Sequence, residues 1–214
     1  MTRETPPPKF RRRAADRPDE VLDAALALFA AQGFARTTVE QVSVRAGLSK
    51  AAVYLYFPSK QALLQAVIHR AVGQAAGMAV AGMAGHRGDP RPVLAALLRQ
   101  IAGVLGDPKA SAIPAIILRE APHAPEIAQI YRDEVLTPIL PALRALIAQG
   151  VDGGFIRPVD PDLTIRSVIG PMLAHVLLAQ VFGVMPQDGL ALDRLIDNHL
   201  TILMAGLAPE KGMA

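Results

Sequence analysis

The 214-residue chain has no cysteine, no tryptophan and few aromatic residues, which make up 4% of its length. The absence of cysteine excludes a disulfide framework, a cysteine-ligated zinc site and a cysteine nucleophile. It is typical of a reducing compartment, and residues 1–13 contain no apolar run of a secretory signal, so we expect a cytoplasmic protein. Charged residues are also few, at 19% against 51% hydrophobic residues, which excludes a disordered chain.

One stretch of the sequence, from Ser167 to Gln187, has no charged residue at all. It is about long enough to cross a bilayer. However, it contains a Gly-Pro pair, a histidine and a further proline, and neither a Lys/Arg cluster nor an aromatic belt flanks it. We therefore expect a helix that is buried on all sides of a soluble assembly, with no membrane partner. A membrane protein is the alternative.

Apolar residues recur at helical spacing along the chain, and the alternation typical of strands is missing. We therefore predict an all-α protein with about nine helices. The first helix is bounded by Pro18 in its first turn and by Gly33 at its end. Pro138 and Pro141 predict a kink in the seventh helix. The predicted helices cover residues 17–33, 38–46, 51–56, 61–83, 93–105, 113–119, 125–149, 161–182 and 190–207.

Positive charge and aromatic residues are concentrated near the N-terminus. Residues 1–60 carry ten Lys/Arg and six Asp/Glu, a net charge of +4, whereas the remaining residues carry 12 and 13, a net charge of −1. Five of the nine aromatic residues lie between Phe29 and Phe57. A basic, aromatic-containing head on a near-neutral aliphatic body indicates a polyanionic partner for the head.

Two short predicted helices joined by a tight turn form the most informative motif, at about residues 38–57. Thr38 followed three residues later by Gln41 is a capping box, and Ser49 is a typical N-cap for the second helix. Gly47 permits the left-handed turn between the two helices. This layout is that of a helix-turn-helix. The small side chains of Ala51-Ala52 let the second helix enter a DNA major groove.

On these residues the sequence resembles the TetR (tetracycline-repressor-like) family of bacterial transcription regulators. The matching residues are Leu28-Phe29, Gly33-Phe34, Thr37-Thr38-Val39, Val42, Arg45-Ala46-Gly47-Leu48-Ser49-Lys50, Val53-Tyr54, Tyr56-Phe57-Pro58-Ser59-Lys60 and Leu63-Leu64. The resemblance implies a three-helix DNA-binding head at residues 17–77 and a larger helical domain for ligand binding and dimerisation at residues 78–214. Residues 1–16 precede the head as a proline-containing, flexible basic arm.

The resemblance also implies which residues of the head contact double-stranded DNA, because the second helix of the motif reads base edges in that family. The predicted DNA-contacting residues are Thr38, Ser49, Lys50, Ala51, Ala52, Tyr54, Tyr56 and Lys60. Glu40 falls where the family has a further base-reading residue, and it either accepts from a cytosine amino group or faces solvent. The run from Arg11 to Arg13 either enters a minor groove or forms a solvated tail.

The body offers few polar side chains that could orient a ligand in an apolar pocket. Arg119, Tyr131 and Gln180 are polar residues in largely apolar stretches, and flexible methionines can line an adaptable pocket. The predicted ligand-binding residues are Met83, Arg119, Tyr131, Met172, His175 and Gln180. For the histidine and the methionines, packing in the core is the alternative.

The last two predicted helices have more apolar surface than one chain can bury. One face of each can pack on its own chain, and the surplus predicts a four-helix interface in a homodimer. The predicted interface residues are Leu177, Val181, Leu195 and Ile196.

The sequence contains no catalytic constellation: its five histidines form no His-Glu-x-x-His motif, and no phosphate-binding glycine loop is present. We expect no enzyme activity, no cofactor and no metal. The predicted function is a ligand-responsive transcriptional repressor that binds a pseudo-palindromic operator as a homodimer and is released by a small lipophilic effector. The alternative is a DNA-binding protein whose C-terminal domain makes protein–protein or architectural contacts without a small-molecule effector.

Overall fold

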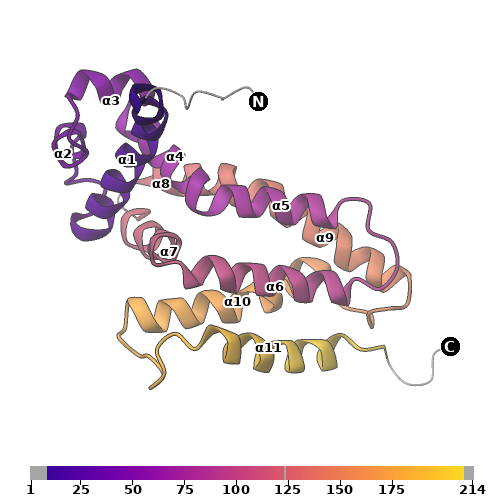
Figure 1. Ribbon diagram of the computed structural model, residues 1–214. Helices are drawn as coiled ribbons and strands as arrows, with labels where there is room; N and C mark the ends of the chain where they lie inside the picture. Colours follow the sequence, from indigo (N-terminus) through magenta and orange to yellow (C-terminus); the bar gives the residue numbers. More distant parts are fainter. Residues whose placement is uncertain (1–8, 123, 210–214) are drawn as a thin grey trace, which may run out of the picture. The chain divides into compact units, whose positions relative to one another are not determined.

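The computed structural model describes residues 9–122 and 124–209, with the side chains of 17–107, 109–122 and 124–209. Within these ranges every regular element is helical (Figure 1). This confirms the predicted all-α class. When α4-η1-α5 (residues 60–83) and α8-η2-α9 (residues 125–152) are each counted as one continuous helix, the described chain has nine helices, as predicted. The chain divides into two compact units, Met1–Val67 and Ile68–Ala214. This boundary lies earlier than the predicted boundary after residue 77.

The first unit consists of three helices and the start of a fourth. These are α1 (Lys9–Gln32), α2 (Val39–Arg45), α3 (Lys50–Tyr56) and α4 (Lys60–Ile68). Helix α1 packs against α2 and α3, and α2 packs against α3. The buried hydrophobic residues of the unit include Val21, Leu22, Ala25, Leu26, Phe29, Phe34, Val39, Val42, Val53, Leu63, Leu64 and Val67. This small core fixes α2 and α3 in the helix-turn-helix arrangement.

Helix α1 begins at Lys9, so the predicted start at Arg17–Pro18 is wrong. Pro18 lies inside the helix, where it removes one backbone donor without ending it. The alanines and arginines that precede it have high helix propensity, which extends the helix toward the N-terminus. Residues 1–8 of the predicted arm, and the side chains of Arg11 to Arg13, lie outside the described residues.

The second unit is a larger bundle that begins with the end of α4. Its elements are η1 (a π-helical turn, His69–Gly73), α5 (Gln74–Met83), α6 (Arg91–Gly106), α7 (Pro108–Glu120), α8 (Pro125–Tyr131), η2 (a second π-helical turn, Arg132–Leu136), α9 (Thr137–Asp152), α10 (Pro161–Gln180) and α11 (Leu192–Leu207).

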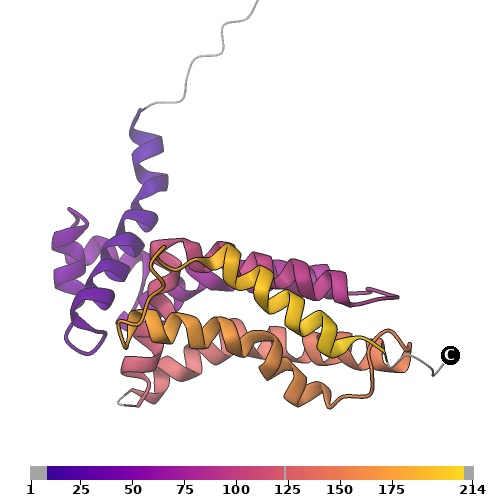
Figure 2. The same cartoon turned by 90° about the horizontal axis from the view of Figure 1, so that it is seen from below.

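Five long helices of this unit enclose a single aliphatic core. Helix α5 packs on α6 and α9, α10 packs on α9 and α6, and α11 packs on α6 and α10. Helices α10 and α11, orange and yellow, lie side by side in both views (Figures 1 and 2). The core contains the buried side chains of Leu94, Leu98, Leu143, Ile147, Val168 and Met172, among others.

The two π-helical turns are features that the sequence does not reveal. Turn η1 interrupts the predicted helix 61–83, and η2 interrupts the predicted helix 125–149. The interruption in the latter lies at Arg132–Leu136, ahead of Pro138 and Pro141, where the kink was predicted. A π-turn shifts the hydrogen-bond register by one residue, as in the bond from the Thr137 N–H to the Arg132 carbonyl.

Two helical stretches of the body are long and apolar enough, by length and composition, to cross a membrane. They are Pro125–Asp152 and Pro161–Gln180. Both are only partly buried within the chain, so each leaves apolar surface exposed.

Candidate functional site

The helix-turn-helix of the head is held by short-range hydrogen bonds at its helix ends. The Gln41 N–H donates to Thr38 Oγ1 (3.2 Å), and the Thr38 N–H donates to Gln41 Oε1 (2.9 Å), which completes the predicted capping box. Gly47 adopts a φ of 67° in the turn. Ser49 caps α3 by accepting from the Ala52 N–H at 3.1 Å. The sequence thus determines the position of α3 through local contacts.

The outer side of α3 is open to solvent. Among the predicted DNA-contacting residues, Thr38, Ser49, Lys50, Ala51, Tyr54 and Tyr56 are exposed, and Ala52 and Lys60 are partly exposed. Val53, on the opposite side of α3, is buried. The helix therefore presents one cation, two phenols and small side chains to a partner, a combination suited to a DNA groove.

Glu40 on α2 lies next to Lys50 on α3. Glu40 Oε2 is 3.7 Å from Lys50 Nζ, and both side chains are largely exposed. An exposed ion pair of this kind contributes little to stability, so either group can exchange its partner for a base edge. The pair also places the carboxylate of Glu40 beside the cation that is predicted to read bases, where it lowers the local positive potential.

Lys60, at the start of α4, has a structural role in addition to its predicted one. Its Nζ donates to the Phe34 carbonyl oxygen (3.0 Å) and to the Ala35 carbonyl oxygen (3.4 Å). The ammonium group also lies 4.3 Å from the centre of the Phe34 ring. These contacts tie α4 to the segment between α1 and α2.

Two exposed apolar residues of the head were not singled out from the sequence. Val44 on α2 and Leu55 on α3 are both strongly exposed. Apolar side chains on a reading helix can contact a thymine methyl group. Each lies two residues after a buried valine, Val42 or Val53, and therefore on the opposite face of its helix. This spacing is the sequence signal that could have identified them.

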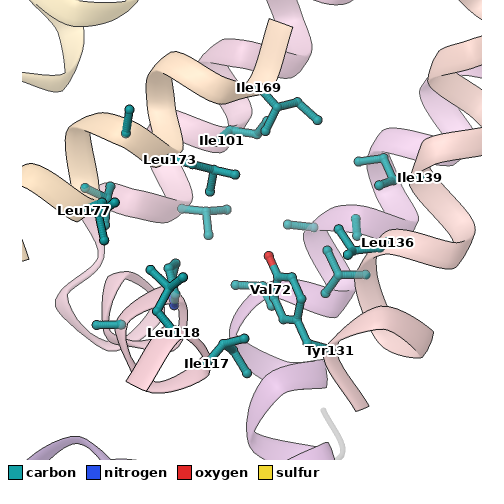
Figure 3. Close-up of a pocket in the computed structure, with 18 of the residues that line it drawn as sticks. Val72, Ile101, Ile117, Leu118, Tyr131, Leu136, Ile139, Ile169, Leu173 and Leu177 are labelled. Atoms are coloured by element: carbon teal, nitrogen blue, oxygen red, sulfur yellow. The ribbon is translucent and has the colours of Figure 1, made fainter. Parts of the chain in front are cut away.

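The body contains a cavity of about 550 Å³, and its wall is almost entirely aliphatic (Figure 3). Turns η1 and η2 and helices α5 to α10 contribute its lining. The described residues that line it include no Asp, Glu, Lys, Arg or His. Its polar members are Gln100, Tyr131 and Gln180. Volume and lining are those of a site for a small lipophilic molecule.

The phenol of Tyr131 reaches into this cavity, with its oxygen directed at the space between Ile101, Leu136 and Leu173 (Figure 3). Its hydroxyl has no hydrogen-bond partner within the described parts of the chain. Burial raises the pKa of the Tyr131 phenol above its ordinary value, because the phenolate would lose hydration. The hydroxyl is therefore protonated at neutral pH and able to donate a hydrogen bond.

The other two polar side chains of the cavity are placed differently. Gln100 Nε2 donates to the Ala75 carbonyl oxygen at 2.9 Å, so part of its amide is already satisfied. Gln180, in the last turn of α10, is exposed. Sequence reasoning missed Gln100, although it too is an uncharged polar residue in a largely apolar helix. The structure thus brings Tyr131 and Gln180, two of the six predicted ligand-binding residues, to the cavity wall.

The remaining four predicted ligand-binding residues do not line this cavity. Met172 is buried in the core, and Met83 is buried beside a smaller hollow of about 310 Å³. His175 Nε2 donates to the Leu190 carbonyl oxygen at 2.6 Å. Arg119 is exposed, and its Nε donates to Glu120 Oε1 at 3.0 Å. These placements favour the packing alternative for the histidine and the methionines.

The predicted dimer residues divide between the core and the surface. Ile196 is 3% exposed within one chain, where it packs in the core, so little of its side chain is left for a partner. Leu177 and Val181 line the cavity, and Leu195 packs partly buried against the core. Apolar periodicity identifies such residues but does not tell which face turns inward. The large apolar residues exposed on α10 and α11 and between them are Leu163, Leu173, Leu178, Val181, Phe182, Val184, Met185 and Ile202.

Two family models match most of the chain. Residues 21–67 match the model of bacterial regulatory proteins of the tetR family, and residues 84–197 match that of the tetracyclin repressor-like C-terminal domain. The chain is 28% identical over 205 residues to the HTH-type transcriptional regulator RutR of Escherichia coli K12, and the match covers 89% of this chain and 90% of RutR.

Solved structures show the same fold at low sequence identity. The transcriptional regulator FadR from Bacillus subtilis, in complex with stearoyl-CoA, is similar with a TM-score of 0.72 at 21% identity, covering 88% of this chain and 98% of FadR. SmeT, the repressor of the Stenotrophomonas maltophilia multidrug efflux pump SmeDEF, is similar with a TM-score of 0.71 at 24% identity, covering 92% of this chain and 93% of SmeT.

Proposed function

Because the chain belongs to the TetR family of bacterial regulatory proteins and is a helix-turn-helix transcriptional regulator, we propose that it is an effector-controlled repressor. As a cytoplasmic homodimer it binds a pseudo-palindromic operator, and a small lipophilic effector in the body releases it. The observation that carries this proposal is the aliphatic cavity in the body of a chain whose head presents an exposed α3.

The DNA-contacting roles follow from the exposure and chemistry of the head. Lys50 and Tyr54 on the outer side of α3 can reach base edges, whereas Thr38, Tyr56 and Lys60 border that side and suit phosphates. A twofold dimer presents two such helices, which requires an operator with matching symmetry.

The exposed apolar residues of α10 and α11 support the dimer over a membrane location. Leu163, Leu178 and Ile202 leave apolar surface on two helices that pack side by side. Two such helices from each chain form a four-helix interface, which covers the surface without lipid. A transcriptional regulator must also reach DNA, and this requirement agrees with a cytoplasmic location.

The effector role rests on the cavity, and one solved structure of the same fold supports it. FadR from Bacillus subtilis was solved with stearoyl-CoA, which has a long apolar chain. A body that served only protein–protein or architectural contacts would have no need of a cavity of about 550 Å³. The cavity therefore favours effector control over that alternative.

Selection of binding sites from a random duplex library tests the DNA-binding part of the proposal. We expect an enriched motif with twofold symmetry. Lys50→Ala should change the base preference at one position of each half-site, at a cost of about 1–3 kcal/mol for the preferred base. Arg99→Ala removes an exposed cation from α6 of the body and should leave both affinity and preference unchanged. An enriched motif without symmetry, or a Lys50→Ala preference equal to that of the wild type, would contradict the assignment.

A further inference from the structure

Among the described residues, the wall of the large cavity carries no charge that could balance a charged ligand. The residues known to line it are aliphatic apart from two amides, one proline and one phenol. A carboxylate or an ammonium group placed inside would lose its hydration and meet no opposite charge. The interior therefore suits molecules that are neutral.

One polar group at the wall is available to a ligand and points inward. The Tyr131 hydroxyl has no partner among the described residues, and its oxygen faces the open space of the cavity (Figure 3). The Gln100 amide already donates to the Ala75 carbonyl oxygen. The Gln180 side chain is exposed, so water competes with a ligand for its amide. A partly buried phenol whose hydroxyl has no partner among the described residues gains a hydrogen bond when a ligand supplies an acceptor.

We propose that the cavity selects an uncharged lipophilic molecule with a hydrogen-bond acceptor, such as a ketone or ester carbonyl, and that the Tyr131 hydroxyl donates to this acceptor. The inference rests on the proposed effector function and narrows its chemistry. Free carboxylates and organic cations of the same size are rejected, because the aliphatic wall cannot replace their hydration. The aliphatic lining binds the rest of the molecule by area and shape.

Four naphthalene derivatives of similar size separate charge from hydrogen bonding. They are 2-acetylnaphthalene, which has a carbonyl acceptor; 2-isopropylnaphthalene, which has none; 2-naphthoate, an anion; and trimethyl(2-naphthyl)ammonium, a cation. Binding to the full-length protein is measured by calorimetry and by competition. We expect the ketone to bind more tightly than the hydrocarbon, and the two ions to bind at least about tenfold more weakly than the ketone.

Tyr131→Phe tests the hydrogen bond without changing the size of the ring by more than one atom. The affinity for the ketone should fall by roughly 2- to 10-fold, the effect of one hydrogen bond, while the affinity for the hydrocarbon stays unchanged. Ala115→Phe fills part of the cavity and should remove ketone binding, whereas Ala96→Phe, on an exposed position of α6, should not. If Ala115→Phe does not fold, the ratio of ketone to hydrocarbon affinity in Tyr131→Phe still tests the proposed hydrogen bond.

Three results would overturn the inference: no binding of the ketone, an ion that competes with the ketone at equal affinity, or an unchanged ratio of ketone to hydrocarbon affinity in Tyr131→Phe. Operator release is measured separately. A compound that releases the operator without competing with the ketone would reject the selectivity and leave effector control standing. Ketone binding as expected, with no cavity ligand able to release the operator, would instead reject effector control.

Discussion

The side chain of Lys60 connects two parts of the head that are far apart in sequence. Its ammonium group donates to the carbonyl oxygens of Phe34 and Ala35 and lies over the Phe34 ring. Hydrogen bonds to a charged group are stronger than neutral ones. The contacts fix the start of α4 against the segment that leads into α2, so Lys60 supports the position of the reading motif whether or not it also holds a phosphate.

Replacing Lys60 by methionine keeps the aliphatic stem and removes the charge. Lys60→Met should lower the free energy of unfolding by about 1–2 kcal/mol, since partly exposed carbonyls recover some hydrogen bonding from water. Lys50→Met, which removes only an exposed ion pair, should stay within about 0.5 kcal/mol of the wild type. Denaturant unfolding checks both values.

The same variant tests the predicted phosphate contact of Lys60. If its ammonium group neutralises one phosphate in each half-site, Lys60→Met should weaken binding to every sequence alike and reduce the salt slope by about one per contact. Salt titrations of operator binding measure this slope. An unchanged slope with lowered affinity would leave Lys60 with the structural role alone.

Residues whose partners are close in sequence were predictable, and those with distant partners were not. Thr38 and Gln41 are three residues apart, so their capping box follows from the sequence alone. His175 bonds to the Leu190 carbonyl, fifteen residues away, and no local pattern reveals that contact. Tyr131 was identifiable as a polar side chain in an apolar stretch, but that criterion also selected Arg119, which is exposed and does not line the cavity.

At the scale of elements, the helical stretch from α4 through η1 to α5 is rich in glycine. It runs from Lys60 to Met83, and its last part contributes cavity-lining residues such as Ala75 and Ala79. A Cβ added at Gly77 or Gly82 would meet no atom within 4 Å. Close packing within the chain therefore does not explain either glycine, and we propose that both soften α5, since glycine lowers helix stability relative to alanine.

Gly77→Ala and Gly82→Ala should each stabilise α5 by about 0.5–1 kcal/mol, because both positions are helical and open. Gly73→Ala is the contrasting variant, since its Cβ would lie 3.2 Å from His69 Nδ1 and 3.5 Å from Glu134 Oε2, and it should gain less or lose stability. Thermal unfolding measures these differences. Destabilisation by both Gly77→Ala and Gly82→Ala would contradict the open surroundings of α5.

The stiffer α5 should also weaken the effect of an effector on DNA binding. A ligand shifts the population of states only by its difference in affinity for them, and a stiffer helix makes the ligand-bound state harder to reach. Operator affinity is measured with and without a cavity ligand in the Gly77→Ala, Gly82→Ala double variant. Release equal to that of the wild type would reject a soft α5 as the coupling element.

Helix existence was easier to predict than helix boundaries or internal register. The nine predicted helices have counterparts in the described chain, because apolar periodicity and glycine ends are strong local signals. The start of α1 was wrong by about two turns, since Pro18 is typical of a first turn yet is tolerated within α1. Turns η1 and η2 contact each other, including between His69 Nδ1 and Glu134 Oε2 at 2.9 Å, and no local sequence pattern encodes such a long-range contact.

For the whole molecule, the surplus apolar surface of α10 and α11 sets the expected assembly. Leu163 on α10 and Ile202 on α11 are 60% and 63% exposed in the single chain. Exposed apolar residues on adjacent helices indicate a contact surface with another chain. The sequence predicts an interface on these two helices, but their outward side chains could be identified only from the packing of one chain.

Ile202→Glu tests the dimer with a matched control. Because Ile202 is exposed in the single chain, the change should leave its fold intact, but in a four-helix interface it would bury an unpaired carboxylate and weaken the dimer by about 3–5 kcal/mol. Met78→Glu, at an equally exposed position of α5 (64%), should leave the dimer unchanged. Light scattering at micromolar concentration measures the mass.

Since two reading helices must bind one operator together, Ile202→Glu should also lose most of its affinity for the symmetric site and keep more of it for a half-site. A monomeric wild type, or equal dissociation in both variants, would show that α10 and α11 do not form the interface.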